Sequence, residues 1–444
     1  MLASGCCEAN RGEIVGSQSV KAAVVAAVLL VVAGACGSSS KGANSSAGAS
    51  KAPAGNTASA PGVSLNTITI GFISSVVGVA GPNFINYPKG AQARIDQQND
   101  QGGINGRKLQ MVFADDGGSV NQNLTAAQSL VSKNVFGVVA GTPFLFAGYR
   151  YLQQQGVPVV GGGYDGPEWN QQPNTNMFSV TGPNVPDFQK QAQNTGTPTF
   201  FKSQGATNVA SLGYGISPSS SASAKGTAEA VKAQGLKAGY VNTSIPFGSV
   251  NVTSVVLGMK QAGVDAVYLA MDNNTNFAIL STAKQNGLNL KVPVAATGYG
   301  QSLLDDPNAV QTGQGSYFNA WGPPLDSKPE KDFRAALQKY QGFSGIPGFD
   351  WYNGWTNVDL MIKGLEAAGK NPTRQSFFTN LRTVTSYDAS GLLPNPVDFS
   401  LAAFGKAPAK TCLWYAKLQG TTFVPVPSDG KPICGTPINA PAGG

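Results

Sequence analysis

The residues that most often carry out chemistry in proteins are sparse in this chain. Its 444 residues include no histidine, which removes Ser-His-Asp and Cys-His nucleophiles and imidazole zinc sites. The adjacent carboxylates Asp115 and Asp116 could share acid and base roles, but a pair directly after a strand pattern more often makes turn contacts. The chain has no Gly-x-Ser-x-Gly elbow and no phosphate-binding glycine motif. The sequence therefore argues against an enzyme and predicts neither a cofactor nor a metal site.

The five cysteines form groups with different expected roles. Cys412 and Cys434 would close a loop of about 20 residues, and a disulfide there would contribute roughly 3 kcal/mol outside the cytoplasm. Two free buried thiols are the alternative. Cys36 follows an apolar run, and the remaining two cysteines lie near the start of the chain. We predict a disulfide between Cys412 and Cys434.

The apolar run at residues 22–32 contains only Ala, Val and Leu. Its length of about 11 residues is half of what a membrane-spanning helix needs, so it is typical of a signal-peptide core. The run ends in Ala33-Gly34-Ala35-Cys36, which resembles the lipobox of bacterial lipoproteins. We predict a lipoprotein signal peptide at residues 1–35 and lipidation of Cys36; an ordinary signal peptide with an Ala-x-Ala-like cleavage site is the alternative.

The segment after Cys36 has the composition of a tether. Residues 37–62 are mostly Ser, Gly, Ala, Asn and Pro, with Lys41 and Lys51 as the only charges, and such a segment cannot bury a core. We predict a flexible linker at residues 36–63.

Length and charge set limits on the remaining chain. About 380 residues remain after the leader and linker, which is enough for two α/β domains. The net charge of +7 is spread over a chain in which only 12% of residues are charged, with no Lys/Arg run. This pattern gives no case for nucleic acid as a partner.

From Thr67 onward, strand-like and helix-like patterns alternate in two tandem units. Strands are expected at 67–73, 108–114, 135–141 and 157–161, and then at 208–213, 238–242, 266–270 and 292–296. Helices are expected between them, near 121–133, 146–155, 219–234, 253–261 and 275–286. The rest predicts a strand at 316–320, helices at 330–340, 351–368 and 373–381, and a hairpin of 413–418 with 423–427. Short connections of this kind indicate doubly wound parallel sheets, which bind ligands beyond the carboxyl ends of their strands.

Several short motifs occur in an order that resembles a known family. They are Ile68-Thr69-Ile70-Gly71-Phe72, Lys89-Gly90-Ala91-Gln92, Gly102-Gly103-Ile104-Asn105-Gly106-Arg107-Lys108, Ala114-Asp115-Asp116 and Ala262-Gly263-Val264-Asp265-Ala266. Together they resemble the leucine/isoleucine/valine-binding type of ABC-transporter substrate-binding protein, over nearly all of residues 67–427. The resemblance implies an α/β protein with two doubly wound parallel-sheet lobes joined by a hinge of three crossovers, the type I periplasmic binding fold. It places lobe 1 at residues 64–181 and 300–395, and lobe 2 at residues 182–299 and 396–440.

The resemblance also implies a ligand site between the lobes. On the first lobe the candidate residues are Ser74, Ser75, Thr142, Phe144, Tyr164 and Asp165. On the second lobe they are Tyr214, Asp272, Asn273 and Tyr299. Hydroxyl groups would suit a ligand carboxylate, and Asp272 would suit an ammonium group.

Several site candidates have a structural alternative, and for Tyr164 it is packing under the hinge. The hydroxyls of Ser75 and Thr142 could bond their own backbone, and Asp272 could cap the helix that follows it. The loop at residues 161–165 and the segment at 216–219 depart from the family pattern. With four aromatic candidates in the set, a larger or aromatic ligand fits at least as well as an aliphatic amino acid.

The sequence therefore predicts an extracytoplasmic substrate-binding lipoprotein of an ABC importer, which captures an amino acid, an amide or a small aromatic acid by hinged closure. We expect a monomer, anchored by lipid to the outer face of the cell membrane, with permease subunits as its protein partner. A lipid-anchored sensor that signals to a membrane receptor is the alternative. A secreted hydrolase is a third possibility, which the missing histidine disfavours.

Overall fold

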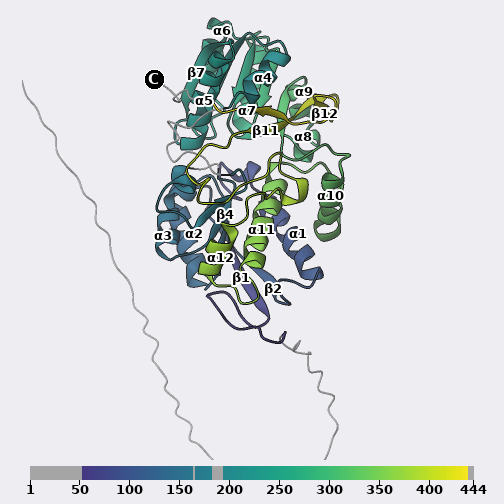
Figure 1. The fold of residues 1–444 in the computed structure, drawn as a ribbon. Helices are drawn as coiled ribbons and strands as arrows, with labels where there is room; N and C mark the ends of the chain where they lie inside the picture. Colours follow the sequence, from purple (N-terminus) through teal and green to yellow (C-terminus); the bar gives the residue numbers. More distant parts are fainter. Residues whose placement is uncertain (1–52, 164–165, 183–193, 439–444) are drawn as a thin grey trace, which may run out of the picture. The chain divides into compact units, whose positions relative to one another are not determined.

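The structure is a computed structural model that describes residues 53–163, 166–182 and 194–438, all within one compact unit of residues 51–444. Two separate sheets organise this unit, and each has helices on both faces (Figure 1). The predicted fold class is confirmed. The predicted leader, Cys36, most of the predicted linker, Tyr164 and Asp165 lie outside the described residues.

The first lobe is built on a five-stranded parallel sheet with the order β2-β1-β3-β4-β5. Its strands are β1 (Thr67–Ser74), β2 (Lys108–Asp115), β3 (Val138–Gly141), β4 (Val159–Gly161) and β5 (Met177–Ser179). Its helices are α1 (Tyr87–Asp100), α2 (Val120–Ser132), α3 (Tyr149–Gln154), α10 (Lys328–Gln341), α11 (Phe349–Ala367) and α12 (Arg374–Leu381). Side chains alternate along β1: Ile70 and Phe72 pack with α1 and α11, whereas Ile73 packs with α2. This alternation buries both faces of the sheet, as parallel sheets require.

The second lobe is built on a sheet with the order β12-β11-β10-β9-β8-β6-β7, to which β13 adds through β11. Its strands are β6 (Asn208–Tyr214), β7 (Lys237–Ile245), β8 (Ala266–Leu269), β9 (Val292–Ala295), β10 (Tyr317–Ala320), β11 (Thr411–Gln419), β12 (Thr422–Val426) and β13 (Ile433–Gly435). Its helices are α4 (Gly196–Ser203), α5 (Pro218–Ala233), α6 (Thr253–Gln261), α7 (Asn273–Gln285), α8 (Gln301–Leu304) and α9 (Pro307–Gly313). Strands β6 to β10 pair in parallel, and the predicted terminal hairpin β11-β12 pairs antiparallel.

Three segments connect the lobes, at residues 180–195, 321–327 and 400–410, although residues 183–193 of the first are not described. The predicted return to lobe 1 at residue 300 is too early. Strand β10 pairs with β9 and β11, so the second sheet gains one more strand before the chain crosses. The predicted boundary at residue 395 is also too early, because Phe399 is buried in the core of the first lobe.

The predicted linker also ends before residue 63. Arg107 is fully buried, and its guanidinium donates to the carbonyl oxygens of Thr57 at 2.9 Å, Ser64 at 2.7 Å and Lys370 at 2.6 Å. These bonds hold residues 53–64 against the first lobe, since a buried guanidinium must find partners for its donors.

Two tryptophans pack in the core of the first lobe, and the predicted disulfide is present in the second. Trp351 and Trp355 of α11 are 5% and 6% exposed and belong to the first lobe's core. Cys412 and Cys434 form a disulfide that joins β11 to β13.

A buried carboxyl group joins α10 to α11. Glu330 is fully buried in the first turn of α10, and it accepts a hydrogen bond from the phenol of Tyr352. Burial raises the pKa of Glu330 to about 7, while the Tyr352 hydrogen bond and nearby Arg334 act in the opposite direction.

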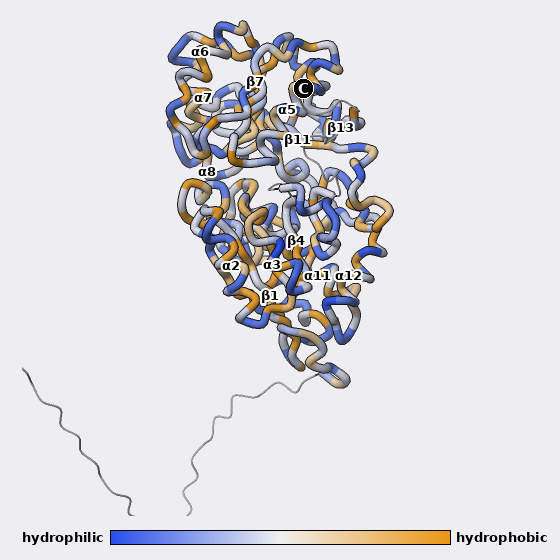
Figure 2. Tube along the Cα trace, turned by 90° about the vertical axis from the view of Figure 1, so that its left-hand side faces the viewer, coloured by the Kyte–Doolittle hydropathy of each residue, from blue (hydrophilic) through white to orange (hydrophobic). Residues whose placement is uncertain are grey.

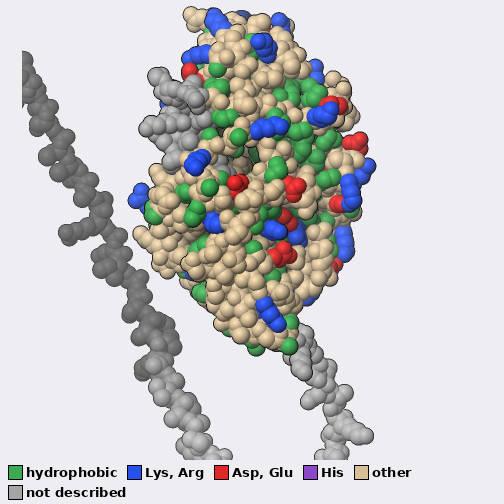
Figure 3. All heavy atoms as spheres, viewed as in Figure 1, with side chains coloured by type: hydrophobic (Ala, Val, Ile, Leu, Met, Phe, Trp, Pro, Cys, Tyr) green, Lys and Arg blue, Asp and Glu red, His purple; other side chains and the backbone are tan. Residues whose placement is uncertain are grey.

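The surface carries few charges. On the face in Figure 3, Lys and Arg side chains are scattered among Asp and Glu, and Figure 2 shows hydrophobic and hydrophilic stretches alternating along both lobes. Among the described residues, no helix is long and apolar enough to cross a membrane, and no group of three or more His, Cys, Asp or Glu could hold a metal ion.

Candidate functional site

A cavity of about 410 Å³ lies at the carboxyl ends of the second sheet's parallel strands. Tyr214 ends β6, Asp272 follows β8, Thr297 follows β9 and Trp321 follows β10, and all four line the cavity. The first lobe contributes Ala80, Asn83, Phe84, Pro143, Gly163 and Asn170. We call this cavity the cleft. Its position matches the general rule that open α/β sheets bind ligands beyond their strand ends.

Aromatic rings form much of the cleft wall. Phe349 packs edge-on against Phe84, with ring centres 5.5 Å apart, and against Trp321 at 4.7 Å. From the second lobe, Phe247 packs against Tyr214 at 4.8 Å. These four rings and Tyr214 all line the cleft. Such a wall favours a ligand with a flat or apolar body.

The amino end of α5 forms a polar part of the same wall. Ser217 caps the helix by accepting from the Ser220 N–H, and Ser220 donates to the Ala270 carbonyl at 2.6 Å. Ser219 is less engaged, because its hydroxyl contacts only the Ser217 hydroxyl, at 3.3 Å. Ser223 lies one turn further along α5 and also lines the cleft. Hydroxyls at a helix amino end, where the dipole is positive, suit a carboxylate.

Asp272 is the one Asp, Glu, Lys or Arg among the described residues that line the cleft. It caps α7 by accepting from the Thr275 N–H at 3.1 Å, and it also accepts from the phenol of Tyr214. Burial raises the pKa of its carboxyl group. The helix-cap alternative is therefore confirmed, and the role of Asp272 toward an ammonium group stays a prediction.

Comparison of the sequence with protein-family models identifies the family of this chain. The family model described as periplasmic binding protein matches residues 67–423. The chain belongs to the periplasmic binding protein family. Members of this family are binding proteins of transport systems, not enzymes, and membership implies a location outside the cytoplasm.

Curated relatives of this binding protein have low identity. It is 28% identical to Leu/Ile/Val-binding protein homolog 3 of Brucella melitensis over 207 residues, which cover 45% of this chain and 53% of that protein. It is 23% identical to Leu/Ile/Val-binding protein homolog 1 of Brucella abortus over 308 residues, which cover 67% of this chain and 79% of that protein. The first alignment thus spans about half the length of the relative.

Solved structures show the same fold. A fatty acid ABC transporter substrate-binding protein from Thermomonospora curvata has a TM-score of 0.69 at 18% identity, covering 86% of this chain and 95% of that chain. A solute-binding protein of an R. palustris ABC transporter, in complex with benzoate, has a TM-score of 0.68 at 14% identity, covering 85% and 99%. At these identities the similarity shows that the fold is shared.

Three predicted hydroxyl ligands of this binding protein point away from the cleft. Ser74 donates to the Gly141 carbonyl at 2.8 Å. Ser75 donates to Asp116 Oδ1 at 2.6 Å, and Thr142 donates to Asp116 Oδ2. None of the three lines the cleft, and all are buried. Sequence analysis did not predict that Asp116 would accept the hydrogen bonds of Ser75 and Thr142.

The remaining predictions divide between the cleft and its surroundings. Phe144 does not line the cleft but packs on Phe247, with ring centres 5.6 Å apart. The backbone N–H of Asn273 donates to Asn83 Oδ1 at 3.4 Å, a contact between the lobes. Tyr299 lies outside the cleft and packs against Phe423, with ring centres 4.5 Å apart and the ring planes tilted by 45°. Of the eight predicted contact residues that the structure describes, Tyr214 and Asp272 lie in the cleft wall.

Sequence reasoning missed the principal aromatic residues of the cleft, Phe84, Phe247, Trp321 and Phe349. Phe247 and Trp321 each follow a strand within two residues of its end, which is a usable signal. It also missed Ser219 and Ser223, although the run Ser217-Pro218-Ser219-Ser220-Ser221 marks the amino end of a predicted helix.

Proposed function

We propose that this protein is the substrate-binding component of an ABC importer and that its solute is a small carboxylic acid with an aromatic or apolar body. Of the three predicted ligand classes, the amino acid and the amide fit the cleft less well than the aromatic acid. The observation that carries this choice is the combination of an aromatic wall with hydroxyls at the amino end of α5.

The acid end of the ligand would bind at α5. Ser219 and Ser223 offer hydroxyls there, and the helix of 16 residues presents its positive dipole end. A hydrogen bond to a charged group contributes about 1.5 to 3 kcal/mol. An ammonium group would gain less, because the carboxyl of Asp272 already accepts from Tyr214 and Thr275.

The apolar body of the ligand would lie between Phe247 of the second lobe and Phe84 of the first. Burying a ring contributes about 1.5 to 3 kcal/mol, and together with the acid contacts this offsets the cost of immobilising the ligand. We expect a dissociation constant on the order of micromolar, which corresponds to a net binding free energy of about 8 kcal/mol. Rotation about the three crossovers would close the lobes over the ligand, and the closed form would be the one that permease subunits recognise.

We further propose a lipid anchor at Cys36 after removal of residues 1–35, on a monomer held at the outer face of the cell membrane. The sequence around Ala33-Gly34-Ala35-Cys36 supports this proposal. Labelled palmitate should be incorporated into the wild-type protein and not into Cys36→Ser, and incorporation into both would contradict the assignment.

The ligand assignment is tested by calorimetry with benzoate on the protein after refolding has removed any bound ligand. Ser219→Ala should weaken benzoate binding by at least tenfold, because the ligand loses one hydrogen bond to its charged group. Ser221→Ala is the matched control, since Ser221 lies on the same helix turn and does not line the cleft. Equal affinities of both variants would contradict an acid site at α5.

A further inference from the structure

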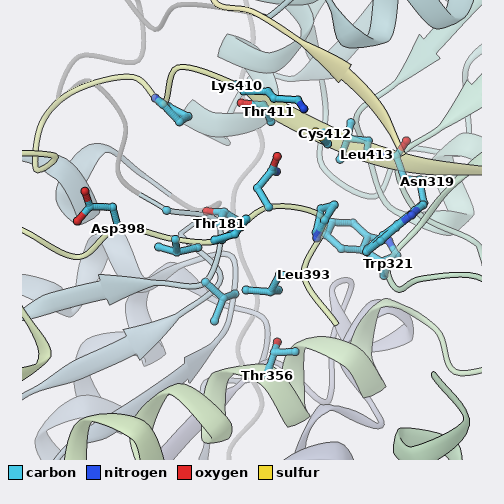
Figure 4. A pocket seen from close by; sticks show the side chains of 18 of the residues that line it. Thr181, Asn319, Trp321, Thr356, Leu393, Asp398, Lys410, Thr411, Cys412 and Leu413 are labelled. Atoms are coloured by element: carbon cyan, nitrogen blue, oxygen red, sulfur yellow. The ribbon is translucent and has the colours of Figure 1, made fainter. Parts of the chain in front are cut away.

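A second cavity, of about 480 Å³, borders the cleft. All three crossovers contribute to it: Val180 to Gly182 from the first, Trp321 from the second, and residues 406–411 from the third. Tyr352 and Thr356 of α11 line its other side. Figure 4 shows Thr181, Leu393, Thr356, Trp321 and Thr411 around this space. We call it the crossover chamber.

The chamber and the cleft share a wall. Six residues line both: Thr181, Gly182, Trp321, Ala407, Pro408 and Thr411. At most one layer of side chains therefore separates the two spaces. That layer belongs to the hinge segments that move when the lobes open or close.

The chamber is lined largely by apolar groups. Leu393, Pro394, Val397 and Leu413 face it. Its charged residues are Lys406 and Lys410, which are exposed to solvent, and Asp398, which is half-buried. An uncharged chain would bury apolar surface against the apolar part of this lining.

Two buried polar atoms of the chamber lining have no partner in the structure, namely Asn319 Oδ1 and Trp321 Nε1. They belong to residues two positions apart, Asn319 within β10 and Trp321 directly after it. Trp321 lines the cleft as well as the chamber. One atom accepts and the other donates, so a hydroxyl group could satisfy both at once.

We propose that the crossover chamber is the second half of the ligand site and that the natural ligand is an elongated acid. Its carboxylate lies at α5, its chain passes the shared wall, and a hydroxyl near its far end bonds Asn319 and Trp321. This inference rests on the proposed function, because it uses the same acid site.

Chain length tests the proposal. Calorimetry with straight-chain alkanoic acids of increasing length should show affinity rising about fourfold per added methylene beyond the length that fills the cleft, then levelling when the chamber is full. At the preferred length, the ω-hydroxy acid should bind at least tenfold tighter than the alkanoic acid with a methyl group in place of the hydroxyl.

Two variants locate the effect. Leu393→Trp should remove the gain from long chains and leave benzoate affinity unchanged, because Leu393 lines the chamber and not the cleft. Leu401→Trp is the matched control, being 63% exposed on the third crossover and lining neither space. Should Leu393→Trp not fold, Asn319→Leu serves instead and should reverse the preference for the hydroxy acid.

The outcomes separate the two proposals. If benzoate binds but affinity does not rise with chain length, or if the rise persists in Leu393→Trp, the chamber is not part of the ligand site. Either result would leave the proposed function standing. Absence of binding for benzoate and for every acid in the series would overturn the proposed function and the chamber with it.

Discussion

Thr142 tests whether buried hydroxyls of the first lobe serve the fold or the ligand. Its hydroxyl donates to Asp116 Oδ2, accepts from the Phe144 N–H at 3.1 Å and lies 3.0 Å from the Ser75 hydroxyl. Thr142→Val keeps the side-chain volume and removes these contacts. The bond to the carboxylate contributes about 1.5 to 3 kcal/mol, and an unpaired buried N–H costs about 1 to 3 kcal/mol.

We therefore expect Thr142→Val to lower the free energy of unfolding by about 2.5 to 6 kcal/mol and to leave benzoate affinity within twofold of wild type. Urea unfolding followed by tryptophan fluorescence gives the first quantity, and calorimetry gives the second. Thr379→Val is the matched control, because Thr379 is exposed on α12. Weaker binding with unchanged stability would refute the assignment of Thr142 to the Asp116 network.

Three further predictions concern stability. Glu330 has a pKa of about 7 when folded, above its ordinary 4.5, so its contribution to stability is complete below about pH 4.5 and is lost as pH rises to about 7. Relative to Glu330→Gln, the wild type should lose about 3 kcal/mol of unfolding free energy between pH 4.5 and 8. Parallel pH profiles of the two proteins in urea unfolding would contradict this. Replacing Cys412 and Cys434 together by serine should cost about 3 kcal/mol by opening a loop with a sequence separation of 22, and an unchanged melting temperature would argue against the disulfide. Arg107→Ala should free residues 53–64 to limited proteolysis, since its guanidinium bonds this segment; the same cleavage pattern as wild type would show that other contacts hold the segment.

Much of the fold was predictable because its signals are local. Strand and helix periods placed β1, β2, α6 and β8 within two residues of their observed ends. These elements are short, bounded by turn residues and buried on predictable faces. The expected turn role of Asp115 and Asp116 also holds, since they accept from the backbone N–H groups of Gly117 and Gly118.

The lobe boundaries were less predictable because they depend on pairing between distant strands. The chain was predicted to return to the first lobe at Gly300, but β10, which follows it, still pairs in the second sheet. Which sheet a strand joins is fixed by hydrogen bonds to strands far away in sequence, and β10 pairs with β11, which begins about 90 residues later.

The site was the least predictable part. A hydroxyl at a strand end can face a ligand or a neighbouring carboxylate, and only the packing of Asp116 against Ser75 and Thr142 decides between them. Phe349 reaches the cleft from the start of α11, nearly 270 residues after Phe84. No local pattern indicates that these two rings meet.

The central claim is that an acid with an apolar body binds between the lobes, in the cleft. Calorimetry of ligand-free protein with benzoate, on wild type and Phe247→Ala, tests it most directly. Phe247 is half-buried and lines the cleft, so its removal should spare the fold, and Phe378→Ala on α12 is the matched control. We predict a dissociation constant on the order of micromolar for wild type and for Phe378→Ala, and at least tenfold weaker binding for Phe247→Ala. Equal binding by all three proteins, or none by wild type, would contradict the account.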